Sequence, residues 1–226
     1  KLVITADGGW RRGKATPLKP AVDEAIQSTP TIEHVLVVRR LGDAVEGGTA
    51  MSDGRDVWWD DIVERQQADC PPVPLDSEHM LYLLYTSGTT GKPKGVPVPV
   101  RALASFHAYL EFGLDVREDD VFWNAADPGW AYGLYYALLG PLAAGRRSIL
   151  LHGGFSPALT WQILDRFGVT NFAAAPTVYR SLRADTAAHP EVTLRRATSA
   201  GEPLTPDVLA WSEETLGAVV RDQYGQ

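Results

Sequence analysis

From residue 80 onward, short apolar runs rich in branched and aromatic residues alternate with amphipathic stretches of helical length. The runs that we expect to form strands are Leu81–Tyr85, Val121–Asn124, Ser148–Leu151, Asn171–Ala175, Arg195–Ser199 and Val219–Gln223. The stretches that we expect to form helices are Ser156–Phe167, Thr177–Ala187 and Pro206–Leu216. Strands that alternate with helices predict an α/β fold, in which helices cover a sheet.

The ends of the expected helices carry the usual sequence signals. Ser156 and Thr205 each stand before a proline, so a hydroxyl cap precedes a proline at the first helical position. Gly168 and Gly217 follow the last helical residues, where glycine commonly ends a helix. These signals support the helix boundaries.

The N-terminal part of the chain adds two expected strands, Leu2–Thr5 and His34–Val38, and a helix near Ala21–Ser28. A polar connection (Gly42–Asp56) and a proline-rich one (Cys70–Leu75) separate these elements from the run at residue 81. We therefore expect the chain to divide into residues 1–80 and residues 81–226.

The overall composition argues against several classes of function. A net charge of −7 gives no support to binding of nucleic acid or of a membrane surface. No apolar run approaches the roughly 20 residues that span a bilayer, and no signal peptide is visible. Cys70 is the only cysteine, and the five histidines are not at metal-ligand spacing, so no metal site is expected. A reducing, cytoplasmic setting fits best.

The segment Thr86–Gly95 (TSGTTGKPKG) holds three glycines, four hydroxyl residues and two of the five lysines in the chain. Exposed backbone N–H groups and lysine ammonium groups suit phosphate oxygens. A Walker A loop is excluded, because Thr86 stands where its first glycine belongs and Pro93 follows Lys92. The glycine spacing also fails the dinucleotide fingerprint G-x-G-x-x-G. The alternative is an ordinary polar loop after a buried strand.

Four segments in this order resemble the adenylate-forming superfamily, in particular acyl-CoA synthetases near the acetyl-CoA and medium-chain acyl-CoA synthetases. LYTSGTTGKPKG closely resembles the phosphate loop of that family. Asp127–Trp130 (DPGW) resembles a segment beside the acyl pocket, and Ala200–Pro203 (AGEP) resembles a segment that lines the adenine site. Asp222–Gln226 (DQYGQ) resembles the start of the aromatic-Gly-x-Thr-Glu segment.

The resemblance implies that the chain belongs to the large α/β domain of an enzyme that uses ATP, Mg²⁺ and CoA. In such enzymes a carboxylate attacks the α-phosphate of ATP, and CoA then displaces AMP. The residues implied to bind the ATP phosphates are Thr86, Ser87, Gly88, Thr89, Thr90, Gly91, Lys92 and Lys94, with Thr86, Lys92 and Lys94 as the catalytic ones. The residues implied at the adenine and AMP site are Gly201, Glu202, Pro203, Asp222, Gln223, Tyr224 and Gln226. For Tyr224 the alternative is ordinary packing at the end of a strand.

The implied wall of the acyl pocket consists of Trp130, Ala131, Tyr132, Ala200 and Gly225. In acetate-specific members of the family, the position of Gly225 carries tryptophan and that of Ala200 carries valine. Both residues are small here, which leaves room for several methylenes, each worth about 0.8 kcal/mol when buried. We therefore expect an acid larger than acetate, although Tyr132 fills part of the space.

The segment Thr5–Lys14 (TADGGWRRGK) resembles a stretch of acetyl-CoA-synthetase-like enzymes in which arginines meet the nucleotide end of CoA. Arg11 matches one such position, and Lys14 replaces an arginine at another. By itself, a cluster of three cations within four residues is either an anion site or a solvated turn. The resemblance favours a CoA site at Arg11 and Lys14.

The sequence departs from the family in two places. Pro97 and Pro99 follow the loop, and they bar a regular central strand there. The glutamate that helps to hold Mg²⁺ in the family is expected directly after Gln226, and the small C-terminal domain with its adenylation lysine after that. We therefore expect the chain to be a piece of a longer enzyme, inactive by itself. The alternatives are an adenylating enzyme with a carrier-protein acceptor, or a nucleotide-binding module without catalysis.

Overall fold

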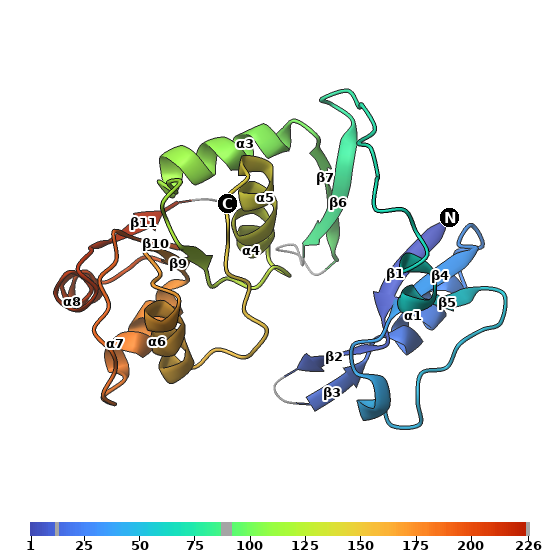
Figure 1. Ribbon diagram of the computed structural model, residues 1–226, viewed down its shortest axis with the longest axis horizontal. Coiled ribbons are helices and arrows are strands. Elements are labelled where there is room, and N and C mark those ends of the chain that lie inside the picture. Colours follow the sequence, from blue (N-terminus) through green and yellow to red (C-terminus); the bar gives the residue numbers. More distant parts are fainter. Residues whose placement is uncertain (12–13, 87–91, 225–226) are drawn as a thin grey trace. The chain divides into compact units, whose positions relative to one another are not determined.

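The computed structural model describes residues 1–11, 14–86 and 92–224, and the chain forms two compact units, Lys1–Val73 and Pro74–Gln226 (Figure 1). The boundary between these units lies in the proline-rich connection. Each unit contains a parallel sheet accompanied by helices, so the predicted α/β fold class is confirmed. None of the helices within the described ranges is long and apolar enough to cross a membrane.

The first unit contains a three-stranded parallel sheet and a separate antiparallel hairpin. The strands of the sheet, in spatial order, are β1 (Leu2–Ala6), β4 (His34–Val38) and β5 (Asp56–Trp58). The hairpin consists of β2 (Gly8–Arg11) and β3 (Lys14–Pro17). The helices are α1 (Lys19–Ile26), the 3-10 helix η1 (Gly42–Ala44) and α2 (Trp59–Val63). The sequence predicted β1, β4 and α1 but not the hairpin.

Two buried charged residues connect the elements of this unit. The Asp7 carboxylate accepts hydrogen bonds from the backbone N–H groups of Gly8, Arg40, Leu41 and Gly42, and it thereby joins the ends of β1 and β4. Lys19, only 1% exposed, places its Nζ 2.7 Å from a carboxylate oxygen of Asp23 and 2.7 Å from one of Asp56. Lys19 therefore ties the start of α1 to β5.

The second unit is built on a parallel sheet with the strand order β11-β10-β9-β8. These strands are β8 (Phe122–Asn124), β9 (Asn171–Ala174), β10 (Arg196–Ala200) and β11 (Val220–Gln223). A separate antiparallel hairpin consists of β6 (Met80–Thr86) and β7 (Lys94–Pro99). The helical segments are α3 (Ala102–Ala108), the π-helical η2 (Tyr109–Gly113), α4 (Ala131–Gly133), the π-helical η3 (Leu134–Leu139), α5 (Gly140–Ala144), α6 (Pro157–Arg166), α7 (Pro176–Ala184) and α8 (Pro206–Leu216).

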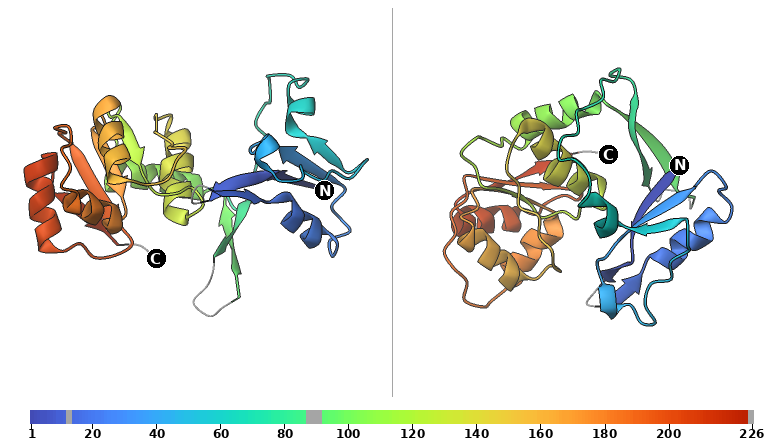
Figure 2. Two further views of the ribbon diagram at one scale, coloured as in Figure 1. Left: turned by 90° about the horizontal axis from the view of Figure 1, so that it is seen from below. Right: turned by 45° about the vertical axis from the view of Figure 1, so that its right-hand side comes forward.

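The parallel sheet of the second unit separates two hydrophobic cores. Trp123 and Phe172 from the sheet pack with Trp161, Tyr179 and Leu216 from α6, α7 and α8. On the other face, a smaller cluster contains Leu110, Leu114, Val116, Phe122 and Ala173. Figures 1 and 2 show α6, α7 and α8 on one side of the sheet, and α3 and α5 on the other. The sequence pattern of alternating strands and helices produces this three-layer arrangement.

Three details differ from the sequence-based expectations. Ser148–Leu151 does not form a strand; Ser148 makes only an isolated bridge to Phe122. Ser156 caps α6 as predicted, because its Oγ accepts a hydrogen bond from the N–H of Leu159, whereas the side chain of Thr205 makes no cap bond to α8. Helix α7 ends at Ala184, three residues before the predicted Ala187, since Asp185 adopts an extended backbone.

Candidate functional site

The carboxyl ends of the parallel strands β8, β9, β10 and β11 meet at one edge of the sheet. Three of the segments singled out in the sequence lie there: the turn after β8, the turn after β10 and the end of β11. Ala200, the last residue of β10, is in register with Gln223, the last residue of β11. Ligands of open parallel α/β sheets bind outside the carboxyl ends of the strands. The fold therefore brings the predicted acyl and AMP residues to the edge that suits a ligand.

The turn after β10 has an exposed backbone held in a conformation that suits only glycine. Gly201 has a φ of +111°, and a side chain added there would meet no atom within 4 Å. Backbone conformation, not lack of space, therefore requires glycine at this position. Glu202 and Pro203 are exposed, and a carboxylate oxygen of Glu202 lies 2.5 Å from a guanidinium nitrogen of Arg180 on α7. The Arg180 contact holds the turn against α7.

The end of β11 presents an exposed aromatic ring beside a fixed amide. Tyr224 is 94% exposed, so its ring packs against no neighbour in the described part of the chain. Asp222 is exposed as well. The side chain of Gln223, in contrast, makes three hydrogen bonds: its Oε1 accepts from the hydroxyls of Tyr109 and Tyr132, and its Nε2 donates one to the carbonyl of Gly113.

The turn after β8 is held in a tight local arrangement. Asp127 Oδ1 accepts a hydrogen bond from the N–H of Gly129 at 2.7 Å, and the Asp127 carbonyl accepts one from the N–H of Trp130 at 2.9 Å. A Cβ at Gly133 would lie 2.1 Å from the Asp127 carbonyl oxygen. Gly133 therefore allows α4 to begin directly against this turn.

The three residues predicted for the acyl-pocket wall after β8 differ in exposure. Trp130 is 73% exposed, and Ala131 is exposed too. Tyr132 is half-buried, and its hydroxyl lies 3.2 Å from Gln223 Oε1. Burial raises the pKa of the Tyr132 hydroxyl above its usual range, so the group stays protonated at neutral pH. Ala200, at the end of β10, is half-buried.

The lysine-rich segment lies at the connection of the β6–β7 hairpin. Thr86 on β6 is in register with Lys94 on β7. Lys92 and Lys94 are exposed, so both ammonium groups are open to a ligand. Pro97 and Pro99 lie in β7, which pairs only with β6 among the described strands and so needs no donors on its other side. Ser87, Gly88, Thr89, Thr90 and Gly91, the side chain of Thr86, and Gly225 and Gln226 lie outside what the structure describes.

The predicted CoA residues stand at the end of another hairpin, in the first unit. Arg11 ends β2, Lys14 begins β3, and the two residues are in register across the hairpin. Lys14 is exposed, while the side chain of Arg11 lies outside the described part. The hairpin thus brings together two cationic positions that the sequence only showed to be near neighbours.

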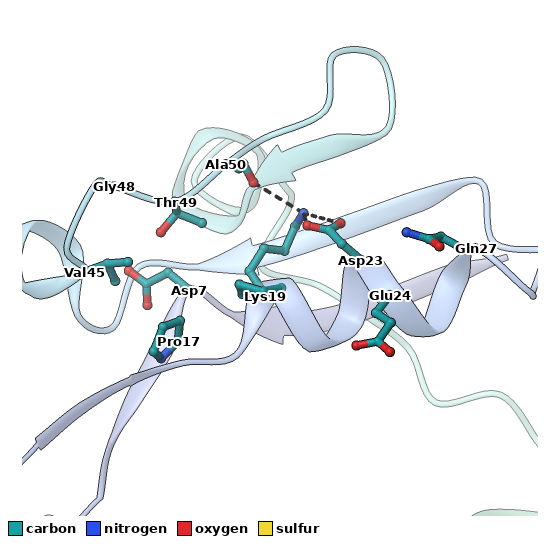
Figure 3. A pocket seen from close by; sticks show the side chains of 11 residues that line it. Asp7, Pro17, Lys19, Asp23, Glu24, Gln27, Val45, Gly48, Thr49 and Ala50 are labelled. Atoms are coloured by element: carbon teal, nitrogen blue, oxygen red, sulfur yellow. Dashed lines mark hydrogen bonds and ion pairs between the residues drawn. The ribbon is translucent and has the colours of Figure 1, made fainter.

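The first unit also has a cavity of about 300 Å³ between α1 and residues 45–50 (Figure 3). Three of its charged lining residues already have protein partners: Lys19 contacts Asp23 and the Ala50 carbonyl, and Asp7 accepts four backbone N–H groups. None of the residues predicted from the sequence lines this cavity.

Sequence reasoning missed Tyr109 and Gly113, which contact Gln223 from the two ends of η2. Neither residue lies in a segment that resembles a family motif. The only signal was the partly apolar pattern around Tyr109, which indicates packing and not a role.

The chain was compared with protein-family models, and the model of the AMP-binding enzymes matches residues 1–226. The chain belongs to the AMP-binding enzyme family. The resemblance to acyl-CoA synthetases seen in the sequence is therefore confirmed, and it covers both units.

This AMP-binding enzyme chain is similar to proteins named acetyl-coenzyme A synthetase and acyl-CoA synthetase. It is 42% identical to an acetyl-coenzyme A synthetase of Methanothrix thermoacetophila and 42% identical to one of Streptomyces coelicolor. Each match covers 96% of this chain and 34% of the relative. A crystal structure of an acyl-CoA synthetase of Brucella canis matches 100% of this chain and 47% of its own, with 32% identity and a TM-score of 0.74. The chain thus spans about a third of the length of these curated relatives.

Proposed function

We propose that this chain is the nucleotide- and acyl-binding part of an enzyme that activates a carboxylic acid with ATP and transfers the acyl group to CoA. The observation that carries the proposal is the meeting of the predicted acyl and AMP segments at one carboxyl edge, with Ala200 in register with Gln223. The two substrates that must react with each other would share this edge.

In the first step, a carboxylate oxygen of the acid attacks the α-phosphorus of ATP, the bond to the bridging oxygen breaks, and pyrophosphate leaves. Both reactants are anions, so catalysis depends on neutralising charge and on alignment. The exposed ammonium groups of Lys92 and Lys94 would neutralise the leaving pyrophosphate. In the second step, the CoA thiol attacks the acyl carbon, and AMP leaves with the electron pair of the broken bond.

The AMP moiety would lie along the ends of β10 and β11. The exposed ring of Tyr224 offers a face on which adenine can stack. The open turn at Gly201 lets a ligand approach the backbone closely. Because protein partners occupy the Gln223 side chain, Gln223 would contribute through its main chain.

The acid is proposed to be larger than acetate. Ala200 has a small side chain at the end of β10, and Gly225 has none, so neither closes the pocket as bulkier residues would. The relatives that are called acetyl-coenzyme A synthetases share 42% identity with this chain, which leaves room for a change of substrate at two positions. CoA is the proposed acceptor, because Arg11 and Lys14 place two cationic positions opposite each other. The lone Cys70 agrees with a reducing cytoplasm.

Mg²⁺ accompanies ATP in the proposed reaction. Within the described ranges, no three His, Cys, Asp or Glu side chains come together in a group that could hold a metal ion. These residues therefore do not fit a Mg²⁺ site of their own. In the described part of this chain, charge neutralisation would rest on Lys92 and Lys94.

The test is ATP–pyrophosphate exchange by the complete polypeptide with a panel of carboxylic acids, followed by assay of AMP release with and without CoA. We expect acid-dependent exchange, and AMP release that requires CoA. Arg11→Ala should raise the KM for CoA in the AMP-release assay and leave the rate of ATP–pyrophosphate exchange unchanged. Absence of exchange with every acid would refute the enzymatic proposal, and transfer only to a carrier protein would refute the assignment of CoA.

A further inference from the structure

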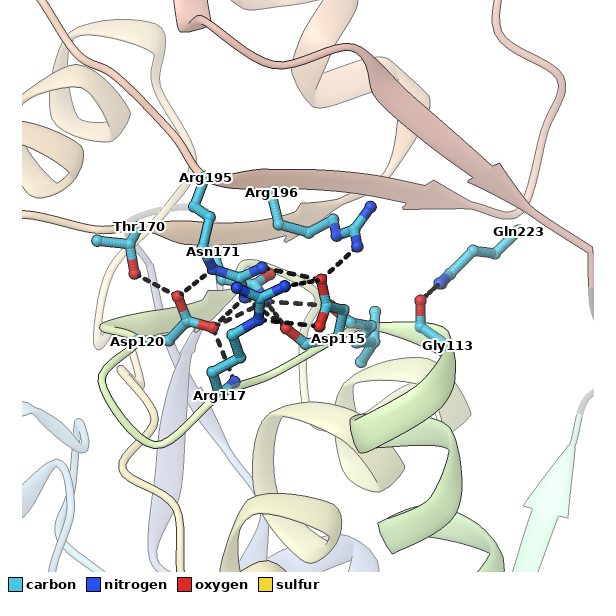
Figure 4. A network of polar contacts seen from close by, with 10 residues as sticks. Gly113, Asp115, Arg117, Asp120, Thr170, Asn171, Arg195, Arg196 and Gln223 are labelled. Carbon is cyan, nitrogen blue, oxygen red and sulfur yellow. Dashed lines mark hydrogen bonds and ion pairs between the residues drawn. The ribbon is translucent and has the colours of Figure 1, made fainter.

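The side chain of Gln223 is held at three points on the α3–α5 side of the sheet. Its Oε1 lies 2.8 Å from the Tyr109 hydroxyl and 3.2 Å from the Tyr132 hydroxyl. Its Nε2 lies 2.9 Å from the carbonyl oxygen of Gly113, a contact that is visible in Figure 4. Since an amide oxygen only accepts, both hydroxyls donate, and they use both of its lone pairs.

Both donors stay protonated at neutral pH. Burial raises the pKa of the Tyr109 hydroxyl and that of the Tyr132 hydroxyl. The Tyr109 ring is fixed in addition by stacking on Tyr136, with ring centroids 4.3 Å apart. The contacts of Gln223 are therefore made by groups with little freedom to move.

Gln223 is fixed to a segment that is itself anchored to the sheet. Tyr109 and Gly113 are the first and last residues of η2, so Gln223 contacts both ends of this single π-helical segment. Two residues after it, Asp115 has a φ of +51° and pairs with Arg195, which directly precedes β10, and with Arg196, the first residue of β10 (Figure 4). This network holds η2 against the sheet from the opposite edge.

Strand β11 needs such support more than its neighbours do. It stands at the end of the strand order and pairs with β10 alone among the described strands. At its last residue, the Gln223 side chain makes hydrogen bonds that tie this edge strand to η2 and to Tyr132.

We propose that Tyr109 is a positioning residue for the nucleotide site. Acting through Gln223, it fixes the carboxyl end of β11 and with it the main chain at Asp222–Tyr224. This inference rests on the proposed function, in which that edge binds AMP. In this role Tyr109 touches neither AMP nor the acid. Its hydroxyl fixes the position of the exposed Tyr224 ring.

The test compares Tyr109→Phe with Tyr136→Phe in the complete polypeptide. Both changes remove one hydroxyl and keep the ring, but the Tyr136 hydroxyl takes no part in the contacts of Gln223. AMP affinity is measured by calorimetry, and the KM values for ATP and for the acid come from pyrophosphate exchange. We expect AMP binding about two- to tenfold weaker in Tyr109→Phe, the range of one lost neutral hydrogen bond, with a matching rise in the KM for ATP. Tyr136→Phe should bind AMP as the wild type does.

A purely structural role of Tyr109 would lower kcat through loss of folded enzyme and leave the KM for ATP unchanged, which would overturn the inference.

A second comparison uses Gln223→Met, which removes all three contacts. In that background, Tyr109→Phe should cause no further loss of AMP affinity, because the two residues act in series; additive losses would count against the inference. If wild-type protein binds no AMP, the proposed function fails together with this role. If it binds AMP and Tyr109→Phe binds it equally well, only this role fails.

Discussion

At the residue scale, the residue type at several positions is determined by closely approaching backbone atoms and not by side-chain chemistry. Gly133 is the clearest of them, because a Cβ there would lie 2.1 Å from the Asp127 carbonyl oxygen and 2.7 Å from that of Ala126. Both neighbours are backbone atoms, which cannot rotate away. The turn after β8 and the start of α4, which carry the predicted acyl-pocket residues, therefore depend on a glycine outside the recognised motif.

Gly133→Ala should destabilise the protein by about 1–3 kcal/mol, the usual cost of overpacking. The matched control is Gly154→Ala, since a Cβ at Gly154 meets nothing within 4 Å. The control should change the free energy of unfolding by no more than about 0.5 kcal/mol. Urea unfolding of both variants measures the difference, and equal stabilities would contradict the described geometry.

The sequence could identify Ala200, Tyr224 and Lys92 as site candidates, because they lie in segments that resemble family motifs. It could not identify Tyr109, since no periodicity links this residue to Gln223, which follows it by 114 positions. A contact of that kind depends on how η2 packs on the sheet, and tertiary packing is not encoded in local pattern. The same limit applies to the network of Asp115, Arg195 and Arg196.

At the element scale, helix caps show how far local sequence signals reach. Ser156 and Thr205 precede prolines in the same way, yet only the Ser156 side chain bonds to its helix, at 3.2 Å from the N–H of Leu159. The same sequence signal therefore gave one cap prediction that is confirmed, at Ser156, and one that is wrong, at Thr205. The helix α8 itself has the predicted bounds, because apolar spacing and Gly217, with its φ of +70°, determine them.

Ser156→Ala should lower the free energy of unfolding by about 1 kcal/mol, as is typical for loss of a serine cap. Thr205→Ala provides the control at the same position of another helix, and there we expect a change below about 0.5 kcal/mol. Thermal or urea unfolding of the two variants measures both changes in the free energy of unfolding. A larger effect at Thr205 than at Ser156 would show that the cap assignment is reversed.

Apart from β5, the strands of the parallel sheets were predictable for a physical reason. Strands buried on both faces are continuous apolar runs, and Asn171–Ala174 is buried throughout. The hairpin β2–β3 and the strand β5 were not predicted, because their residues are glycine-rich, charged or exposed and lack the alternation of a half-buried strand. Pairing with neighbours, rather than intrinsic preference, makes them strands.

At the scale of the whole molecule, both units carry carboxylates that are ionised more easily in the folded state. Burial opposes ionisation of Asp56 and Asp120, but hydrogen bonds outweigh it and hold the pKa of each below the usual range. The donors are Arg55 and Lys19 for Asp56, and Arg195, the Arg117 N–H and Thr170 for Asp120. Since the folded pKa lies below the unfolded value of about 3.9, the stabilisation is fully present above that pH and is lost as the pH falls below it.

The free energy of unfolding should therefore decrease steeply below about pH 4. Asp120→Asn should lower stability at pH 7 by about 2–4 kcal/mol, because it removes a buried carboxylate and leaves Arg195 with Asp115 as its remaining charged partner. The variant should also show a weaker decrease of stability in acid. Glu118→Gln is the control, since the Glu118 side chain is 90% exposed and should follow the wild type. Urea unfolding from pH 7 to pH 3 measures these slopes, and parallel curves for wild type and Asp120→Asn would contradict the account.

We propose that in the whole enzyme this chain contributes the site at which an acid larger than acetate is joined to AMP. The relatives are named acetyl-coenzyme A synthetases, so the size of the acid is the property in which we expect this enzyme to differ from them. If a buried methylene contributes about 0.8 kcal/mol, two additional methylenes should improve kcat/KM about tenfold.

The most direct measurement is ATP–pyrophosphate exchange by the complete polypeptide with acetate, butyrate and hexanoate at matched concentrations. We expect a kcat/KM for butyrate or hexanoate at least about tenfold above that for acetate. Ala200→Val should reduce this preference, because the larger side chain fills the end of β10. A kcat/KM for acetate far above those for the longer acids would contradict the account.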